Sequence, residues 1–280
     1  MPQPVVLITG TSSGIGLATA VATARAGWAT VATLRNPAGD GALRSAAEAA
    51  GVELDIRALD VTDAAAIGSC VEAVVADHGH LDAVVNNAGA GHIGTIENED
   101  VDAVRRVMEV NFFGVVAVTK AVLPHLRATG GRLVTVSSVG GAVGQPFNEA
   151  YCAAKFAVEG FLESLAPVAA TVGVRVTIVE PGPVATEFVA NVGVDPAVLF
   201  AEAGPYEPAL QAYVSHVTAD FSSDAAQTGD QVAEVVLAAL TDPSPAVRIQ
   251  TSPWAERFVA AKLADLDGAA VQAVTGSWVR

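Results

Sequence analysis

The 280-residue sequence predicts an α/β fold built on a parallel sheet with helices on both faces. Two observations support this prediction. Short runs rich in β-branched residues alternate at least six times with alanine-rich runs of helix length. The apolar runs are nearly continuous, which is typical of strands that are buried on both faces. The length falls in the range that α/β proteins fill as one domain.

The expected strands occupy residues 4–9, 29–33, 52–59, 82–86, 132–137, 175–180 and 246–250. Helical runs between them include 17–27, 63–79, 156–173 and 231–240. Asp63 stands where a helix begins, and Gly27 and Gly173 stand where helices end. The one irregular region, about 188–226, is rich in Pro, Gly and acidic residues, and we interpret it as a lid or binding loop.

Composition excludes several classes of function. A net charge of −15 argues against a nucleic-acid partner, which needs a basic face. Cys70 and Cys152 are the two cysteines and form no disulfide framework, which fits a reducing compartment. The N-terminus enters a strand-like run without a leader-like segment, and we expect no apolar segment long enough to span a bilayer. We therefore expect a cytoplasmic protein with a small-molecule substrate, no nucleic acid and no membrane insertion.

A glycine-rich turn, TGTSSGIG (9–16), follows the first strand and opens a helix. Backbone N–H groups of such a turn and the helix N-terminus face an anion, as in dinucleotide-binding folds. A tight turn without a ligand is the alternative. The expected coenzyme-binding residues of this turn are Gly10, Thr11, Ser12, Ser13, Gly14, Ile15 and Gly16.

The end of the second strand favours NADP over NAD. NAD-binding folds commonly place an acidic residue there for the ribose hydroxyls, whereas this chain has Leu34 followed by Arg35. A guanidinium pairs with a ribose phosphate through a charge-assisted fork; a solvated strand-end arginine is the alternative. Asp60 and Val61 are expected to border the adenine, unless Asp60 is only a turn residue. Small residues in NNAG (86–89) allow close approach of a ligand to Asn87, Ala88 and Gly89, although the asparagines could instead hold adjacent loops.

Together the motifs resemble the short-chain dehydrogenase/reductase family. TGTSSGIG, NNAG, Asn111, Ser138, Tyr151-x-x-x-Lys155 and PGPVAT (181–186) occur in the order and spacing of that family, over about residues 4–250. The stretch 137–165 is most similar to the branch of estradiol-type hydroxysteroid and retinol dehydrogenases. The resemblance implies a Rossmann-type, doubly wound, seven-stranded sheet in a single domain, 1–280, and hydride transfer between a nicotinamide and an alcohol or carbonyl carbon.

Within this domain we expect a coenzyme half at about 1–130, a catalytic and substrate half at about 131–250 with the lid at 188–226, and a C-terminal helical extension at 251–280. The resemblance also implies that the backbone around Pro181, Gly182, Val184 and Thr186 contacts the nicotinamide and phosphates. The helices that carry Asn111 and Tyr151 form subunit interfaces in many relatives, so we expect a homodimer or homotetramer.

Tyr151 and Lys155 lie one helical turn apart and therefore share a helix face. A ketone that accepts hydride at carbon needs a proton at oxygen. A tyrosine does this poorly at its free pKa of about 10, but a nearby cation favours the phenolate and lowers that pKa. We therefore expect Lys155 to lower the pKa of Tyr151 and, from the resemblance, to hold the nicotinamide ribose. A chance Tyr-x-x-x-Lys on an amphipathic helix is the alternative.

Ser138, thirteen residues before Tyr151, is expected to hydrogen-bond the substrate oxygen, with Ser137 as the alternative. By resemblance, Asn111 holds a water that relays protons from the lysine; a helix kink stabilised by its side chain is the other reading. Cys152 is interpreted as packing. The five histidines show no metal-ligand spacing, and no metal is expected.

The substrate is expected to be a neutral, fairly apolar alcohol, ketone or aldehyde. No Lys or Arg occurs between Arg175 and Arg248, whereas anionic carriers usually need basic residues at the mouth of a site. The residues expected at the substrate are Ser138, Val143, Phe147, Asn148, Tyr151, Phe188, Val189, Leu199, Tyr206 and His216. Two alternatives remain: a catalytically idle protein that senses NADP(H), and an NAD-linked alcohol dehydrogenase.

Overall fold

The computed structural model describes residues 2–185, 196–222, 226–267 and 269–279. Seven strands form one sheet: β1 Val5–Thr9, β2 Ala29–Leu34, β3 Asp55–Ala58, β4 Ala83–Asn86, β5 Arg132–Val136, β6 Arg175–Glu180 and β7 Arg248–Gln250. The order across the sheet is β3-β2-β1-β4-β5-β6-β7, and every pair is parallel. The predicted single-domain, seven-stranded parallel fold is confirmed, and each strand overlaps a run expected from the sequence, although the edge strands β3 and β7 are short and only partly buried.

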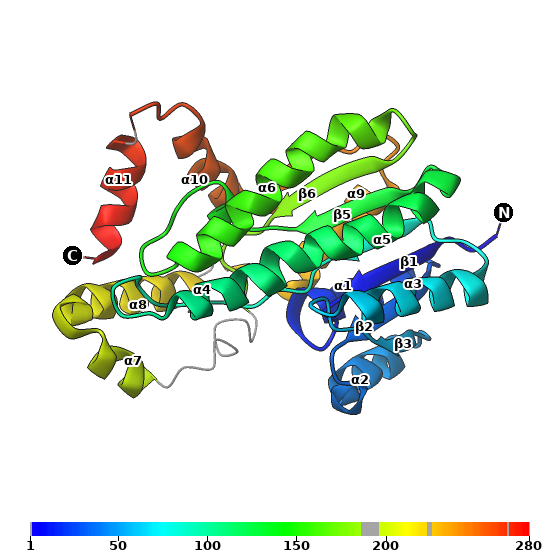
Figure 1. Ribbon diagram of the computed structural model, residues 1–280, viewed down its shortest axis with the longest axis horizontal. Helices are drawn as coiled ribbons and strands as arrows, with labels where there is room; N and C mark the ends of the chain where they lie inside the picture. The colour runs from blue at the N-terminus through cyan, green and yellow to red at the C-terminus, as the bar shows by residue number, and fades with distance from the viewer. Residues whose placement is uncertain (1, 186–195, 223–225, 268, 280) are drawn as a thin grey trace.

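Helices cover both faces of the sheet (Figure 1). They are α1 Gly14–Arg25, α2 Gly41–Ala50, α3 Ala64–His78, α4 Val101–Met108, α5 Gly114–Thr129, α6 Glu149–Ala170, α7 Pro196–Glu202, α8 Glu207–Ser222, α9 Gly229–Thr241, α10 Pro253–Leu263 and α11 Ala269–Gly276. Helices α3, α5 and α6 bury their apolar side chains against one face. Helices α1, α2 and α9 pack on the other.

Local signals place the predicted helix ends correctly. The Asp63 carboxylate accepts hydrogen bonds from the N–H groups of Ala65 and Ala66 at 2.9 and 3.0 Å, which satisfies the open donors at the start of α3. Gly27 and Gly173 follow α1 and α6 with φ of 88° and 83°, a left-handed conformation that glycine adopts without steric cost.

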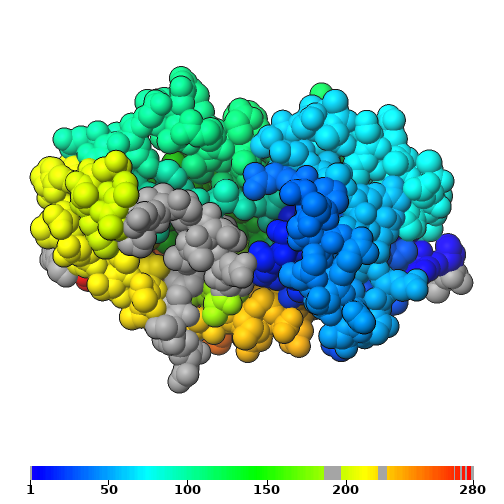
Figure 2. All heavy atoms as spheres, turned by 90° about the horizontal axis from the view of Figure 1, so that it is seen from below, coloured from blue at the N-terminus to red at the C-terminus, as the bar shows by residue number. Residues whose placement is uncertain are grey.

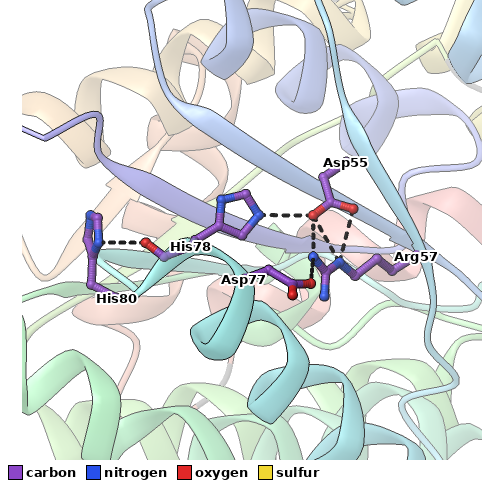
Figure 3. Close-up of polar contacts among 5 residues, drawn as sticks. All are labelled: Asp55, Arg57, Asp77, His78 and His80. Atoms are coloured by element: carbon purple, nitrogen blue, oxygen red, sulfur yellow. Dashed lines mark hydrogen bonds and ion pairs between the residues drawn. The ribbon is translucent and has the colours of Figure 1, made fainter.

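The edge strand β3 is held to the end of α3 by a cluster of charged side chains (Figure 3). Arg57 donates to Asp55 at 3.0 Å and to Asp77 at 2.8 Å, and His78 Nε2 lies 2.9 Å from Asp55. The guanidinium and imidazole outweigh burial and hold the pKa of Asp55 below its usual range. The cluster ties the edge strand β3 to the helix that packs on one face of the sheet.

The region about 188–226 is not the irregular loop that we expected. Where the structure describes it, the chain forms α7, a short 3-10 helix η5 (Gly204–Tyr206) and α8. Pro196 and Pro208 fall in the first turns of α7 and α8, where proline costs a helix no hydrogen bond, so they mark helix starts and not a loop. Figure 2 shows this helical segment in yellow on one side of the molecule and the first residues of the chain in blue on the other.

One helix is more apolar than we predicted. Residues Val101–Thr129, which comprise α4, a π-helical turn η2 (Glu109–Phe113) and α5, are long and apolar enough to cross a membrane by length and composition. The expectation that no such segment exists is therefore wrong. In the fold, Val115, Val118 and Val122 of this helix lie in the core beneath the sheet, which accounts for its composition.

Candidate active site

A cavity of about 980 Å³ lies at the carboxyl ends of β1, β2, β4, β5 and β6, where open α/β sheets bind ligands. The residues that follow each of these strands line it, and segments from α8 to the C-terminus close its far side. Most of the predicted coenzyme residues line this cavity: Gly10, Ser12, Ser13, Gly14, Ile15, Gly16, Arg35, Asp60, Val61, Asn87, Ala88, Gly89, Pro181, Gly182 and Val184. Thr186 lies outside the described residues.

The glycine-rich turn is held by its neighbours in a tight conformation. Thr11 is fully buried and does not line the cavity, because its hydroxyl and its N–H both bond to the carbonyl of Thr33. The Asn87 amide donates to the carbonyls of Thr9 and Gly10 at 3.0 and 2.8 Å. A Cβ on Gly16 would lie 2.1 Å from the Gly10 carbonyl oxygen, so only glycine fits there. The loop-holding role considered for the asparagines is therefore real, and it shapes a backbone cradle suited to phosphates.

Arg35 stands at the outer end of the cavity without an acidic partner on its own strand. Leu34 ends β2 with its side chain buried, and Arg35 is exposed beside Asp60. The Asp60 carboxylate accepts hydrogen bonds from the N–H and hydroxyl of Thr62, which together with the charge of Arg35 hold its pKa below the usual range. Asp60 thus forms a turn, and its position borders the cavity as well.

Ser138, Tyr151 and Lys155 meet in the middle of the cavity. Ser138 follows β5, and its side chain hydrogen-bonds the Tyr151 hydroxyl and accepts from the N–H of Gly140 at 3.0 Å. Tyr151 and Lys155 share one face of α6, with Lys155 Nζ 5.8 Å from the centre of the Tyr151 ring. Lys155 is 4% exposed, and Nζ donates to the carbonyl of Val136 at 3.0 Å.

Burial biases both titratable groups toward their neutral forms. It raises the pKa of Tyr151 above its usual range, against the opposing hydrogen bond from Ser138. It lowers the pKa of Lys155 to about 8, against the opposing charge of Glu159. We expected Lys155 to lower the pKa of Tyr151. In this structure burial dominates the pKa of Tyr151 and the bond from Ser138 opposes it, while the Lys155 ammonium donates to the Val136 carbonyl.

Asn111 lies in the π-helical turn and is completely buried. Its amide nitrogen donates to the carbonyls of Ala90 and Val107 at 3.0 and 3.1 Å, and its oxygen accepts from the N–H of Ala90 at 3.2 Å. These bonds satisfy the side chain and hold the loop after β4 against a widened helical turn. Asn111 does not itself line the cavity. The structure therefore agrees with a helix kink stabilised by the Asn111 side chain, and the water-relay role stays a prediction.

The predicted substrate residues divide into two groups. Asn148 and His216 line the cavity; Asn148 donates to the Tyr213 hydroxyl at 2.5 Å, and His216 stacks on Trp278 at 4.8 Å. The assignment of Val143 and Phe147 to its wall is corrected: neither lines the cavity, and both are buried in the core cluster to which the wall residues Val139, Tyr213 and Trp278 also belong.

Other wall assignments are corrected as well. Leu199 packs against the same core cluster as Val143 and does not line the cavity. Tyr206 is exposed and donates to Glu97 at 2.5 Å. Phe188 and Val189 lie outside the described residues.

Sequence reasoning missed much of the far wall. Its apolar part consists of Ile93, Val139, Val217, Trp254 and Trp278, together with Tyr213. Trp254 and Trp278 come from the C-terminal extension, to which we assigned no role. Two of the three tryptophans lie in the last 30 residues, and this was the one available signal. His92 also lines the cavity, with Nε2 2.6 Å from Glu99.

Comparison with known proteins agrees with this geometry. The family model described as short chain dehydrogenase matches residues 4–197. The chain is 37% identical to retinol dehydrogenase 8 from Bos taurus over 278 residues, with 94% of this chain and 86% of the relative covered. It is 39% identical to human 17-beta-hydroxysteroid dehydrogenase type 1 over 267 residues, with 92% and 80% covered.

Solved structures show the same fold with either coenzyme. An alcohol dehydrogenase from the archaeon Thermococcus sibiricus, complexed with 5-hydroxy-NADP, is 27% identical with a TM-score of 0.71, over 89% of this chain and 95% of that one. A short chain dehydrogenase/reductase from Burkholderia phymatum, in complex with NAD, is 25% identical with a TM-score of 0.81, over 95% of each chain.

Proposed function

The chain belongs to the short-chain dehydrogenase family, and on that premise we propose that it is an NADP(H)-dependent oxidoreductase. The substrate class is a neutral, fairly apolar secondary alcohol or ketone, or an aldehyde. The observation that supports this best is the meeting of Ser138, Tyr151 and Lys155 in one cavity whose outer end carries Arg35. The relatives named as retinol dehydrogenase 8 and 17-beta-hydroxysteroid dehydrogenase type 1 match 94% and 92% of this chain.

In this proposal each residue has a defined task. The coenzyme supplies or accepts a hydride, and its oxidised ring is positively charged. Tyr151 exchanges a proton with the substrate oxygen, which Ser138 orients through the hydroxyl that already bonds Tyr151. Lys155 holds the coenzyme ribose, and its ammonium lies 5.8 Å from the centre of the Tyr151 ring, where positive charge favours the phenolate. The Pro181–Val184 backbone borders the nicotinamide end of the cavity.

The position of Arg35 supports NADP. It lies at the cavity edge, is exposed, and has no carboxylate before it on β2 that would repel a ribose phosphate. An NAD-linked dehydrogenase is the second candidate, and the relative in complex with NAD shows that the fold accommodates that coenzyme.

The lining of the far wall supports an apolar substrate. The cavity is lined there by the apolar side chains of Ile93, Val217, Trp254 and Trp278. The relatives described above include a retinol dehydrogenase and a 17-beta-hydroxysteroid dehydrogenase. Among the lining residues, Arg106 is the one exposed cation besides Arg35, and it stands beside Glu109, so the mouth is not a basic patch.

We also propose that the protein acts in the cytoplasm as a homodimer or homotetramer, without membrane insertion or nucleic acid. Phe113, Phe156 and Val168 are exposed on η2 and α6 and support an interface on these helices. Light scattering measures the assembly; a monomer at micromolar concentration rejects it.

The test of the function compares two tyrosine variants. Tyr151→Phe removes the proposed proton donor, while Tyr206→Phe removes an exposed hydroxyl that does not line the cavity. We expect NADPH consumption with a panel of bulky ketones to fall at least ~100-fold in the first variant and less than ~2-fold in the second. Absence of turnover by the unmodified protein across the panel, with tight NADPH binding, would instead support the idle NADP(H)-sensing alternative.

A further inference from the structure

Two carboxyl groups are buried together just outside the cavity. Glu159 lies on α6 one turn after Lys155 and is 5% exposed, and Glu180 ends β6 and is completely buried. Their side chains are within hydrogen-bond reach of each other. Neither residue lines the cavity, so the proposed activity does not explain why these two carboxyl groups are buried.

The charges around this pair do not balance if both carboxyls are ionised. Arg248 of β7 lies 3.1 Å from Glu159 and 2.8 Å from Glu180, and it also reaches the exposed Glu163 at 3.0 Å. One guanidinium thus contacts two buried carboxylates, and the other cation that faces the pair, the Lys155 ammonium, acts on Glu159 but contacts neither carboxylate directly. A buried charge without compensation is expensive, so one of the two carboxyls holds a proton near neutrality.

The hydrogen-bond pattern agrees with a shared proton. Gln250 donates to Glu180 Oε2 at 2.6 Å, but Glu159 Oε1 and Glu180 Oε1 accept no well-directed hydrogen bond from a protein donor. A proton on one carboxyl supplies the missing donor for the other. Burial, strengthened by the charge of Glu159, raises the pKa of Glu180 to about 7.

The pair is also connected to the catalytic groups. Side chains on α6 at i and i+4 lie on one face, and the carboxylate of Glu159 opposes the burial that lowers the pKa of Lys155. A Cβ on Gly141 would meet Glu159 Cγ and Ser137 Oγ, both at 2.8 Å, so the pair also packs under the turn that follows Ser138. Among the described residues, the charged groups that face the pair are Lys155 and Glu163 of α6 and Arg248 of β7.

We propose that Glu159 and Glu180 share one proton and set the charge of Lys155 from outside the cavity, which makes both of them positioning residues. Below neutral pH the pair carries one negative charge, which Arg248 compensates. When the shared proton leaves for solvent, the pair gains a second negative charge, and the carboxylate of Glu159 favours the ammonium form of Lys155. Lys155 thereby stays charged at a pH where burial alone would discharge it.

This inference rests on the role proposed for Lys155, and matched glutamine variants on α6 test it. Glu159→Gln removes the buried charge, whereas Glu163→Gln removes an exposed carboxylate that contacts the same Arg248. We expect the alkaline limb of the kcat–pH profile to move about one pH unit lower in Glu159→Gln and less than ~0.2 unit in Glu163→Gln. Identical profiles for both variants and the unmodified enzyme would overturn the proposal, while the function itself stands as long as Tyr151→Phe is inactive.

A second measurement does not depend on activity. Because the pKa of Glu180 is raised in the folded protein, the folded state binds more protons than the unfolded state between about pH 4.5 and 7, and stability falls as the pH rises through that window. Glu180→Gln removes this dependence and can still accept the bond from Gln250. We expect the melting temperature of the variant, measured relative to that of the unmodified protein, to increase as the pH rises from 5 to 8. A constant difference across that range would show that Glu180 holds no proton.

Discussion

Replacement of Arg35 by leucine tests the coenzyme assignment quantitatively. The 2′-phosphate of NADP carries close to two negative charges, and NAD lacks it. Arg35 is exposed, so its interaction is screened: at ~4 Å in water each charge contributes about 1 kcal/mol, or ~2 kcal/mol in all. That energy corresponds to a factor of about 30 in affinity. The Michaelis constant for NADPH should therefore rise ~30-fold, while that for NADH changes less than ~3-fold.

The assay is initial-rate kinetics with each coenzyme at a fixed, saturating ketone concentration. Arg25→Leu is the control, because Arg25 is also exposed but does not line the cavity. It should leave both Michaelis constants unchanged. Equal losses with NADPH and NADH in Arg35→Leu would refute the assignment of Arg35 to the ribose phosphate.

Two further predictions concern the turn and the far wall. Gly16→Ala should weaken binding of either coenzyme at least ~10-fold in a fluorescence titration, because its Cβ would overlap the Gly10 carbonyl. The control is Gly68→Ala in α3, where an added Cβ would have no atom within 4 Å, and this variant should bind coenzyme normally. Equal affinities of the two variants would contradict a phosphate cradle formed by the glycine-rich turn. Trp278→Ala should raise the Michaelis constant for bulky apolar ketones ~10-fold or more and leave coenzyme affinity unchanged. The reason is that it opens the cavity wall where Trp278 stacks on His216 and Phe258. An unchanged Michaelis constant would show that the substrate does not contact this wall.

The sequence was sufficient to predict the sheet and the shared helix face of Tyr151 and Lys155, because both depend on local patterns. Buried parallel strands are continuous apolar runs, and Tyr151 and Lys155 share a face whatever surrounds α6. The helices between 196 and 222 were missed because proline was read as a sign of loop structure, although a first helical turn accepts it.

The substrate wall could not be read from the sequence in the same way. Val143 and Phe147 lie close to Tyr151 in sequence, yet they do not line the cavity, whereas Trp278 of the same core cluster reaches it from the other end of the chain. Which face a side chain takes there depends on packing between distant elements, which a local pattern does not encode. The same holds for Glu159 and Glu180, whose proximity follows from the packing of α6 on β6.

The most direct test of the account is Lys155→Met, with the exposed Lys120→Met as its control. Under saturating coenzyme we expect Lys155→Met to lose turnover at least ~100-fold and to lose the alkaline limb that the lysine, with its pKa of about 8, imposes on the pH profile. Lys120→Met should match the unmodified enzyme. If Lys155→Met kept both its turnover and its pH profile, the proposed chemistry of Tyr151 and Lys155 would be wrong.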